Sequence, residues 1–304
     1  MLVNFFRLNL VNPPIRPISS QADFETGLSF GTGFRNQIYD PLTLKSSDSS
    51  FHQIKITGYT FSNFSFSKTL IEDVMFNDCI FEDCLFIGTE LRDCEFHNCI
   101  FKNVNTHKII IENCYVNPSS FNEAVIGYKF ANIGVHLFHQ LLQNSKDQSQ
   151  RSFARLAEYQ FKKWENRLLV SKYKSRGPHR ITLARFLPKF LLNCLKDLVF
   201  GYGLRFRNFA ITFSIVFIGF WILNYQKWNA FAFHKKDLSI ESFNPDSANI
   251  VSSGLYTLDV TTKLVDSQFQ PTSTVGMYYY AAESICAFIL LSALVTLILN
   301  RFVK

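Results

Sequence analysis

Residues 56–101 read ITGYTFSNFSFSKTLIEDVMFNDCIFEDCLFIGTELRDCEFHNCIF and carry a large apolar residue at every fifth position. These residues are Ile56, Phe61, Phe66, Ile71, Phe76, Phe81, Phe86, Leu91, Phe96 and Phe101. A period of five fits neither the α-helix, with about 3.6 residues per turn, nor the β-strand, with a period of about two. The chain must therefore turn a corner every five residues and return above itself, which predicts a stacked coil.

A second set of inward positions lies two residues before each apolar position and is mostly small. Its members are Val74, Cys79, Cys84, Thr89, Cys94, Cys99, Val104, Ile109 and Cys114. One large and one small residue per side suits a coil with four five-residue sides, so residues twenty apart should stack in columns. Asp and Asn recur two residues after the apolar position, where they tolerate the dihedral angles of a turn.

This pattern resembles the pentapeptide-repeat family over about residues 51–127, with one lapse at Thr106. The resemblance implies a right-handed four-sided parallel β-helix. Rods of this kind serve as scaffolds, as docks for partner proteins and, in some members of the family, as mimics of the DNA duplex. The overall fold class is therefore predicted to be mixed, because the rest of the chain follows other patterns.

The cysteines suggest a metal site at first sight. Five of the seven lie within residues 79–114, beside His97 and His107. Metal sites usually use close Cys-X-X-Cys pairs, whereas these spacings are multiples of five and the histidines fall outside that phase. Because buried Cys behaves as a small apolar residue, we predict thiols packed in the core and no metal. Columns of free thiols also favour a reducing cytosol.

The first fifty residues show no comparable period. Segments rich in Gly, Pro, Ser and Asn interrupt them. We predict that residues 1–50 form a cap for the open end of the rod and are in part disordered. Residues 1–11 are apolar but contain Arg7 and no cleavage-site pattern, so a signal peptide is not expected.

The charge is distributed unevenly along the chain. Residues 51–126 contain ten acidic residues and five Lys or Arg, whereas residues 151–207 contain fourteen Lys or Arg and three acidic residues. A basic block can indicate nucleic acid, but this one directly precedes an apolar segment. Cytoplasmic flanks of membrane helices are rich in Lys and Arg, and anionic headgroups attract them. We therefore expect a lipid bilayer as the partner and no nucleic acid.

Residues 128–207 form the predicted basic, amphipathic helical linker. Apolar residues recur at steps of three and four within residues 135–142 and 153–174. In residues 180–199, leucines oppose Arg and Lys, and Pro188 predicts a kink. We expect this last stretch to lie on the inner membrane surface, with packing against the preceding helix as the alternative.

Residues 208–304 contain two apolar segments of membrane length. Residues 208–228 and 278–299 each supply roughly twenty residues, enough to cross a hydrocarbon core of about 30 Å. Basic residues flank the outer ends of the pair. The pattern predicts a multi-pass protein of the cell inner (plasma) membrane, with both termini in the cytoplasm and the connecting loop outside.

The connecting loop has an ordered pattern of its own. Ser252-Ser253-Gly254 is expected to cap a short helix at residues 255–262, which ends in two threonines. Irregular residues 263–270 and a Pro-Thr-Ser stretch precede the second apolar segment. This order resembles the two-span pore domain of potassium-channel-like ion channel proteins.

The likeness extends to a wider set of features. The basic segment 151–174, the Phe-Gly-Tyr-Gly stretch at 200–203 and Glu283 are similar to those of bacterial proteins that join pentapeptide repeats to such a pore module. The resemblance implies a re-entrant pore-helix loop, ion transport and a homotetramer, with Glu283 bracing the loop or, alternatively, relaying protons. The residues that it places in the pore and filter region are Thr261, Thr262, Lys263, Asp266 and Glu283.

The sequence departs from that family at the filter. Its members usually follow the paired threonine with Leu-Gly-Tyr-Gly-Asp, whose carbonyl groups replace the water around the ion. Here residues 263–270 read KLVDSQFQ, without glycine. A run of inward carbonyl groups at unusual dihedral angles is costly without glycine, so we do not expect potassium selectivity.

Two functions remain open from the sequence. The first is an ion channel-like membrane protein with a cytosolic repeat module that senses or docks a partner protein; the second is a non-conducting, membrane-anchored scaffold. A duplex mimic that binds a DNA-handling enzyme is a third, weaker interpretation. The sequence shows no nucleophile–base pair or phosphate loop, and His136 and His139 are interpreted as structural. No enzyme activity and no cofactor are therefore expected.

Overall fold

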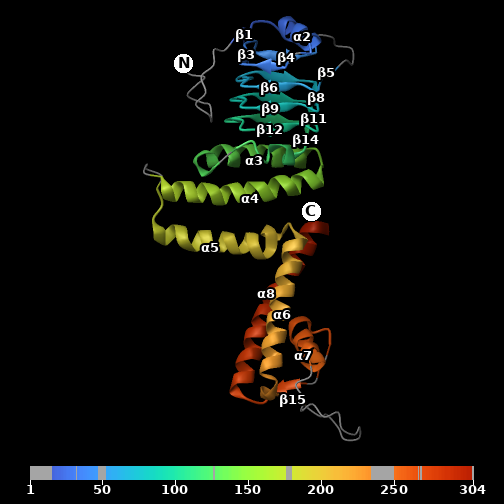
Figure 1. Cartoon of the computed structure of the whole chain (residues 1–304), viewed down its shortest axis with the longest axis vertical. Coiled ribbons are helices and arrows are strands. Elements are labelled where there is room, and N and C mark those ends of the chain that lie inside the picture. The colour runs from blue at the N-terminus through green and yellow to red at the C-terminus, as the bar shows by residue number, and fades with distance from the viewer. Residues whose placement is uncertain are drawn as a thin grey trace. The chain divides into compact units, whose positions relative to one another are not determined.

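A computed structural model describes residues 16–31, 33–46, 53–125, 127–175, 180–233, 250–265, 267 and 269–302. The chain divides into two compact units, Met1–Leu191 and Leu192–Lys304, hereafter the N-terminal and C-terminal units (Figure 1). The boundary falls inside helix α5 (Leu183–Phe200). Each unit has its own architecture.

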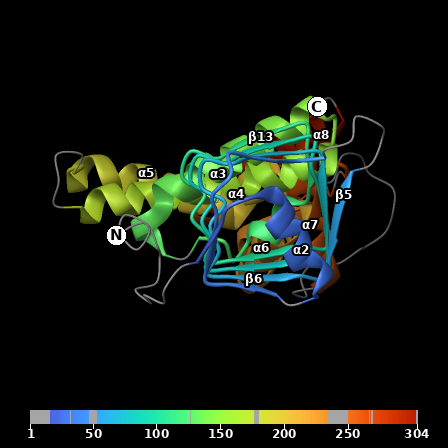
Figure 2. The ribbon, with the colours of Figure 1, turned by 90° about the horizontal axis from the view of Figure 1, so that it is seen from above.

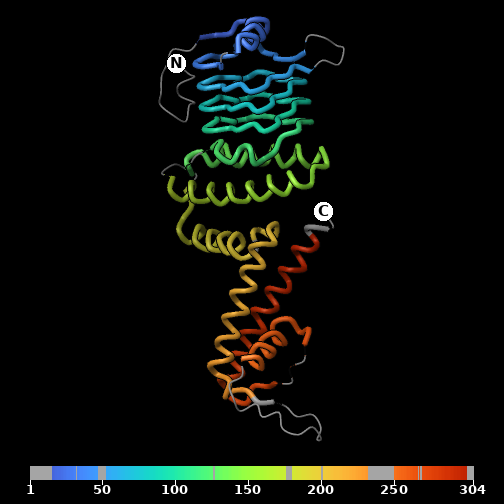
Figure 3. Tube along the Cα trace, turned by 45° about the vertical axis from the view of Figure 1, so that its right-hand side comes forward, coloured from blue at the N-terminus to red at the C-terminus, as the bar shows by residue number. Residues whose placement is uncertain are grey.

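The N-terminal unit contains a parallel β-solenoid of about five turns, consistent with a pentapeptide-repeat fold (Figures 1 and 3). Its strands are β1 (Arg16–Ile18), β2 (Phe34–Arg35), β3 (Gln37–Tyr39), β4 (Thr43–Lys45), β5 (Ile54–Thr57), β6 (Thr60–Ser62), β7 (Leu70–Glu72), β8 (Val74–Asn77), β9 (Ile80–Glu82), β10 (Glu90–Arg92), β11 (Glu95–His97), β12 (Ile100–Lys102), β13 (Ile110–Glu112) and β14 (Tyr115–Val116).

Successive turns are joined by backbone hydrogen bonds in three four-stranded parallel sheets. Their orders are β13-β10-β7-β4, β14-β11-β8-β5 and β12-β9-β6-β2. Isolated parallel bridges link Ser65 with Leu85 and Leu85 with Asn105 in a further column. Phe61 lies opposite Phe81, so the register in this part of the stack is twenty residues. Figure 2 looks along the stack, where strands of successive turns superpose.

The predicted core residues fill the interior of the stack. All of those from Phe61 to Phe101 are buried, as are the small residues of the second inward set. The ring of Phe81 stacks between those of Phe61 and Phe101, with centroids 5.0 and 4.7 Å away. Offset-stacked rings at these distances add a favourable contact beyond the burial of apolar surface.

The corners of the solenoid use the dihedral angles that the Asp and Asn spacing predicts. Left-handed φ values occur at Asp73, Asp78, Asp83, Asp93, Asn98, Asn103 and Asn113. Asp and Asn tolerate this region better than most residues because their short polar side chains can bond locally. The prediction is confirmed at each of these positions.

The first turn of the solenoid begins earlier than the sequence indicated. Phe34, Tyr39 and Leu44 are buried and five residues apart. Phe34 pairs with Phe61, 27 residues later, instead of twenty, so this turn contains seven additional residues. The insertion shifts the apolar positions by two residues relative to those of the later turns. A search for one uninterrupted five-residue phase therefore misses the first turn.

A short helix packs against the first turn of the solenoid. Helix α2 (Gln21–Ser29) begins at Ser20, whose hydroxyl accepts a hydrogen bond from the backbone N–H of Asp23. Its Phe24 is fully buried and stacks on Phe34, with ring centroids 4.8 Å apart. Helix α2 thus lies on the first turn of the solenoid, while a cap formed by residues 1–50 as a whole stays a prediction.

Two helices close the other end of the solenoid. After the short 3-10 helices η1 (Pro118–Phe121) and η2 (Tyr128–Phe130), α3 (Ala131–Asp147) packs against α4 (Arg151–Lys174). The side-chain amide of Asn144 donates to the backbone carbonyl of Cys114 and accepts from its N–H, both at 2.8 Å. One side chain thus continues the backbone ladder and protects an open strand edge.

The C-terminal unit is built around two long helices. Its elements are η3 (Gly201–Gly203), α6 (Phe206–Gln226), η4 (Trp228–Ala230), β15 (Phe231–Phe233), α7 (Ile250–Thr262), β16 (Phe269–Pro271) and α8 (Thr274–Phe302). Both α6 and α8 are long and apolar enough to cross a membrane. The preceding helix α5 (Leu183–Phe200) contains Pro188 and joins the two units.

The expected N-cap of α7 is wrong. The helix begins at Ile250, so Ser252 and Ser253 lie inside it and are buried. The hydroxyl of Ser253 donates to the carbonyl of Ile250 at 3.1 Å. A serine hydroxyl can bond back to its own helix as readily as it can cap one, and the sequence did not distinguish the two.

Phe81→Ala should destabilise the solenoid strongly, because it leaves a cavity in the middle of a ring stack. The expected cost is about 3–5 kcal/mol. Ile100→Ala is the matched control, since Ile100 points outward and is 42% exposed, and it should change stability by about 0.5 kcal/mol. Hydrogen exchange of the solenoid amides in the full chain measures both effects. Equal protection in the two variants would contradict the assigned phase.

The seven cysteines should fall into two reactivity classes. Cys79, Cys84, Cys94, Cys99 and Cys114 are buried, whereas Cys194 and Cys286 are partly exposed. Hydrogen bonding to Cys79 and burial raise the pKa of the Cys99 thiol, which lowers the fraction of reactive thiolate. Alkylation of the folded full chain, read by peptide mass spectrometry, should modify Cys194 at early times and leave the five solenoid cysteines unmodified. Early modification of the other five would show that the core does not protect them.

Candidate functional site

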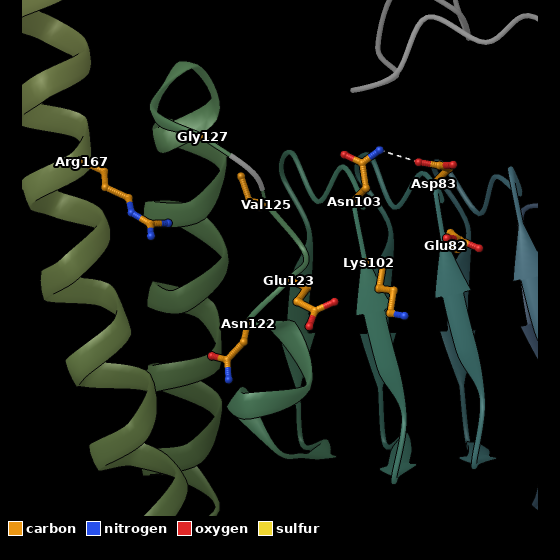
Figure 4. Close-up of a pocket in the computed structure, with 9 residues that line it drawn as sticks. All are labelled: Glu82, Asp83, Lys102, Asn103, Asn122, Glu123, Val125, Gly127 and Arg167. Carbon is orange, nitrogen blue, oxygen red and sulfur yellow. Dashed lines mark hydrogen bonds between the residues drawn. The ribbon is translucent and has the colours of Figure 1, made fainter.

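A cleft of about 470 Å³ lies where the last solenoid turns meet α4. Figure 4 shows Arg167 projecting from α4 on one side and Lys102 among the strands on the other. Acidic side chains share the cleft: Glu82, Asp83 and Glu123. The side chain of Asn103 donates to Asp83, and the two stack in one column of corners.

The two histidines interpreted as structural lie on α3. The Nδ1 atom of His136 is buried and has no hydrogen-bond partner within the described part of the chain. Burial lowers the pKa of His136, and the neighbouring His107 and His139 lower it further. The ring of His139 lies 5.6 Å from that of Phe161 on α4. The lowered pKa of His136 and the ring contact of His139 fit a packing role.

A group of polar contacts lies in the C-terminal unit, where α7 packs against both α6 and α8. The indole N–H of Trp221 on α6 donates to the carbonyl of Ile250 at 3.0 Å and to the hydroxyl of Ser253 at 3.2 Å. A Cβ at Gly254 would approach the Trp221 ring to 3.2 Å. Glycine at this position thus lets the first turns of α7 lie directly on α6.

A buried carboxylate connects the three helices. Glu283 on α8 is fully buried, and its Oε2 accepts a hydrogen bond from the side-chain amide of Asn224 on α6 at 2.9 Å. The same amide nitrogen donates to the hydroxyl of Thr257 on α7 at 3.0 Å. Thr257 in turn donates to the carbonyl of Ser253 at 2.8 Å. Both amide hydrogens of Asn224 are used, so the donors and acceptors of the network are fixed.

Several polar atoms around this network have no partner. Within the described part of the chain, Glu283 Oε1, Asn224 Oδ1 and the Tyr256 hydroxyl form no hydrogen bond. Each polar group left unpaired in a buried site costs about 1–3 kcal/mol. Polar groups inside apolar helices are expensive and mark functional positions more often than other residues do. We therefore take Asn224, Thr257 and Glu283, the three-helix junction, as the centre of the candidate site.

The C-terminal end of α7 is tied to the segment that follows it. The Asp259 carboxylate accepts hydrogen bonds from the backbone N–H and the hydroxyl of Ser267, at 3.1 and 2.7 Å. Lys263 ends the helix with a φ of 55°. Its Nζ lies 3.9 Å from Asp259 Oδ1 and 5.6 Å from the centre of the Tyr280 ring. The Asp259 carboxylate thus contacts both Lys263 and Ser267 and stabilises the turn by which the chain leaves α7.

A short sheet and an aromatic cluster join the two ends of the segment between α6 and α8. Strand β15 pairs antiparallel with β16, so the segments before and after α7 meet. Trp228, Phe231, Tyr256 and Val260 form a buried cluster beside the sheet. A Cβ at Gly276 would lie 2.7 Å from the carbonyl oxygen of Ala230. Only glycine permits this close crossing at the start of α8.

The predicted pore and filter residues are distributed over two places. Thr261 and Thr262 end α7, where their hydroxyls donate to the carbonyls of Thr257 and Leu258, each at 2.6 Å. Lys263 follows and is exposed, whereas Glu283 lies in the three-helix junction. Asp266 falls outside the described residues.

Sequence reasoning missed Asn224, Thr257 and Asp259. Asn224 had a signal, because it is a polar residue within an otherwise apolar segment. The partners of Thr257 and Asp259 depend on how three separate segments meet, and no spacing within one segment reveals that.

The fold defines a class of protein: a parallel β-solenoid followed by helices, two of them long and apolar enough to cross a membrane. No protein-family model matches the chain, and no curated protein matches it. The geometry of the molecule itself therefore carries the functional argument.

Glu283→Ala should destabilise the C-terminal unit by about 1–3 kcal/mol, because it leaves a donor of Asn224 buried without a partner. Glu283→Gln keeps an acceptor oxygen and should retain most of the stability. Thr296→Ala on the same helix is the control, since that exposed hydroxyl bonds only to Ser292 in its own helix. Hydrogen exchange of α7 in lipid nanodiscs reports the effect. The network has no bracing role if Ala at position 283 leaves α7 as protected as in the parent protein.

Proposed function

We propose that the protein is an ion channel-like membrane protein, with a pentapeptide-repeat module in the cytosol that senses or docks a partner protein. In this proposal α6 and α8 cross the cell inner membrane, and α7 is a re-entrant pore helix. The solenoid is a right-handed four-sided coil, and both termini are cytoplasmic because basic residues flank the outer ends of the two spans. Several copies, a tetramer by resemblance to the family, surround one aqueous axis.

One observation carries the proposal: a short helix is fixed between two apolar helices by buried polar side chains. Trp221 and Asn224 bind α7 from α6, and the Asn224 amide also binds Glu283 of α8. Buried polar side chains are costly in membrane helices, so we interpret these side chains as the groups that position α7. The backbone that follows α7 also needs water or protein partners at membrane depth. A shared water-filled axis supplies them.

The end of α7 supports a pore without potassium selectivity. Lys263 occupies the position where the related channels begin a glycine-rich filter, and its side chain is exposed. The hydroxyls of Thr261 and Thr262 are directed back to their own helix. A ring of lysine side chains around the axis repels cations, while Asp259 offsets part of that charge. The proposed pore is therefore weakly selective or tolerant of anions.

The main alternative is a non-conducting, membrane-anchored scaffold. The observation that favours it is the same departure at the filter, together with the cleft of mixed charge on the solenoid. In that case the three-helix junction stabilises an anchor, and the interaction surface of the solenoid carries the function. The two alternatives differ in one property that can be measured, which is current through the assembled protein.

Lys263→Glu should shift the reversal potential of the reconstituted protein toward that of cations in a potassium chloride gradient, because it inverts the charge at the end of α7. Planar-bilayer recording measures the shift. Lys227→Glu is the matched control, since Lys227 is exposed at the end of α6 and lies outside α7 and the segment that follows it. Its effect should be small.

The recordings also separate the two functions. An assembled oligomer without current in the parent protein and in both variants would favour the scaffold. An equal shift from the two substitutions would contradict the placement of Lys263 at the axis.

A further inference from the structure

Helix α5 presents a row of exposed leucines. Leu183, Leu187, Leu191, Leu195 and Leu198 follow steps of four and three, which places them on one side of a helix. All five are exposed, from 47% at Leu187 to 76% at Leu198. A soluble surface rarely keeps such a row in water.

A strip of positive charge borders the leucine row. Arg185, Lys189 and Lys196 are spaced by four and seven residues, so they share another side of the helix and are all exposed. None of the three forms an ion pair with a residue that the structure describes. Asp197 is the one acidic residue of α5. Its backbone carbonyl accepts a hydrogen bond from the Asn208 side chain at 3.0 Å.

The end of α5 is fixed to the start of the first apolar helix. Asn208 and Thr212 on α6 bind the carbonyls of Asp197 and Val199, at 3.0 and 3.3 Å. These bonds satisfy carbonyl groups that a helix end otherwise leaves unpaired. The last residues of α5 therefore lie beside the entry of α6.

The connection between the two helices is a sharp turn. Gly201, Tyr202 and Gly203 all have left-handed φ values, of 51°, 56° and 75°. A Cβ at Gly201 would lie 2.7 Å from the Cβ of Arg205, so this position requires glycine. Three successive left-handed residues prevent α5 and α6 from forming one continuous helix. A helix that turns away where a membrane helix begins can lie along the membrane surface.

We propose that α5 binds the surface of a bilayer that contains anionic lipid, with its leucine row among the upper acyl chains and Arg185, Lys189 and Lys196 on the headgroups. Helices with an apolar face and cationic side chains bind at this depth. The charge of the strip selects anionic headgroups, and each cation contributes roughly five-fold to the binding. The inference rests on the membrane placement in the proposed function but is independent of conduction.

The test places nitroxide labels on the full chain in nanodiscs of phosphatidylcholine, with and without phosphatidylglycerol. A Cys194→Ala, Cys286→Ala background removes the two accessible thiols, and single cysteines then replace Leu191, Asn193 or Ile215. Collisions with oxygen, which enters lipid, and with a water-soluble nickel chelate report the depth of each label. Ile215 on α6, 66% exposed, reports membrane insertion, and Asn193 reports another side of α5.

The expected result is a lipid-accessible label at Leu191 and a water-accessible label at Asn193, with the contrast greater in anionic nanodiscs. The triple substitution Arg185→Gln, Lys189→Gln and Lys196→Gln should reduce the gain in lipid access at Leu191 that phosphatidylglycerol produces. The matched control neutralises three exposed cations of α4 instead, with Arg151→Gln, Arg155→Gln and Lys172→Gln, and should leave that gain in place.

Three results would overturn the inference. A water-accessible label at Leu191 places the helix off the membrane, and a label inaccessible to both reagents shows that protein covers the leucine row. If lipid access at Leu191 does not increase in anionic nanodiscs, or if the triple substitution does not reduce that increase, α5 has no specificity for anionic headgroups. A water-accessible label at Ile215 would instead show that the proposed membrane placement of α6 has failed.

Discussion

A backbone N–H or C=O that is removed from water must find a partner, and both units of this protein are organised by that requirement. In the solenoid, each turn supplies hydrogen-bond partners for the backbone of the next turn. At the end of the stack, the side-chain amide of Asn144 supplies them for Cys114 in place of a further strand. In the C-terminal unit the requirement falls on the segment between α6 and α8. Helix α7 satisfies most of its own groups, and the side chains of Trp221 and Asp259 bind the chain at its two ends.

The fold could be predicted from the sequence wherever one residue type repeats in a fixed phase. The five-residue period predicted the ring stack around Phe81 and the left-handed corners at Asp and Asn. It missed the turn of Phe34, Tyr39 and Leu44, because seven additional residues change the phase without changing the period. The bounds of α4 and α6 followed within two residues from amphipathic or apolar runs, which local pattern determines well. Helix α8 extends beyond the predicted residues 278–299 at both ends.

The candidate site was less accessible from the sequence. Glu283, Thr261, Thr262 and Lys263 were identified through resemblance, but the geometry around them comes from tertiary contacts. The junction exists because α6, α7 and α8 bring one polar residue each to the same place. The start of α7 was misplaced for a related reason: Ser252 and Ser253 serve the helix interface, where their hydroxyls are buried, instead of the cap.

We propose that α7 and the chain after it reach membrane depth beside a water-filled axis shared by several copies. A single copy in lipid cannot supply that axis. The most direct measurement is the mass of the full-length protein in native mass spectrometry, after extraction into lipid nanodiscs. A single closed homo-oligomer, a tetramer, is the predicted result. A monomer under the same conditions, with the three-helix junction intact, would contradict the pore and leave α6, α7 and α8 as an anchor for the solenoid.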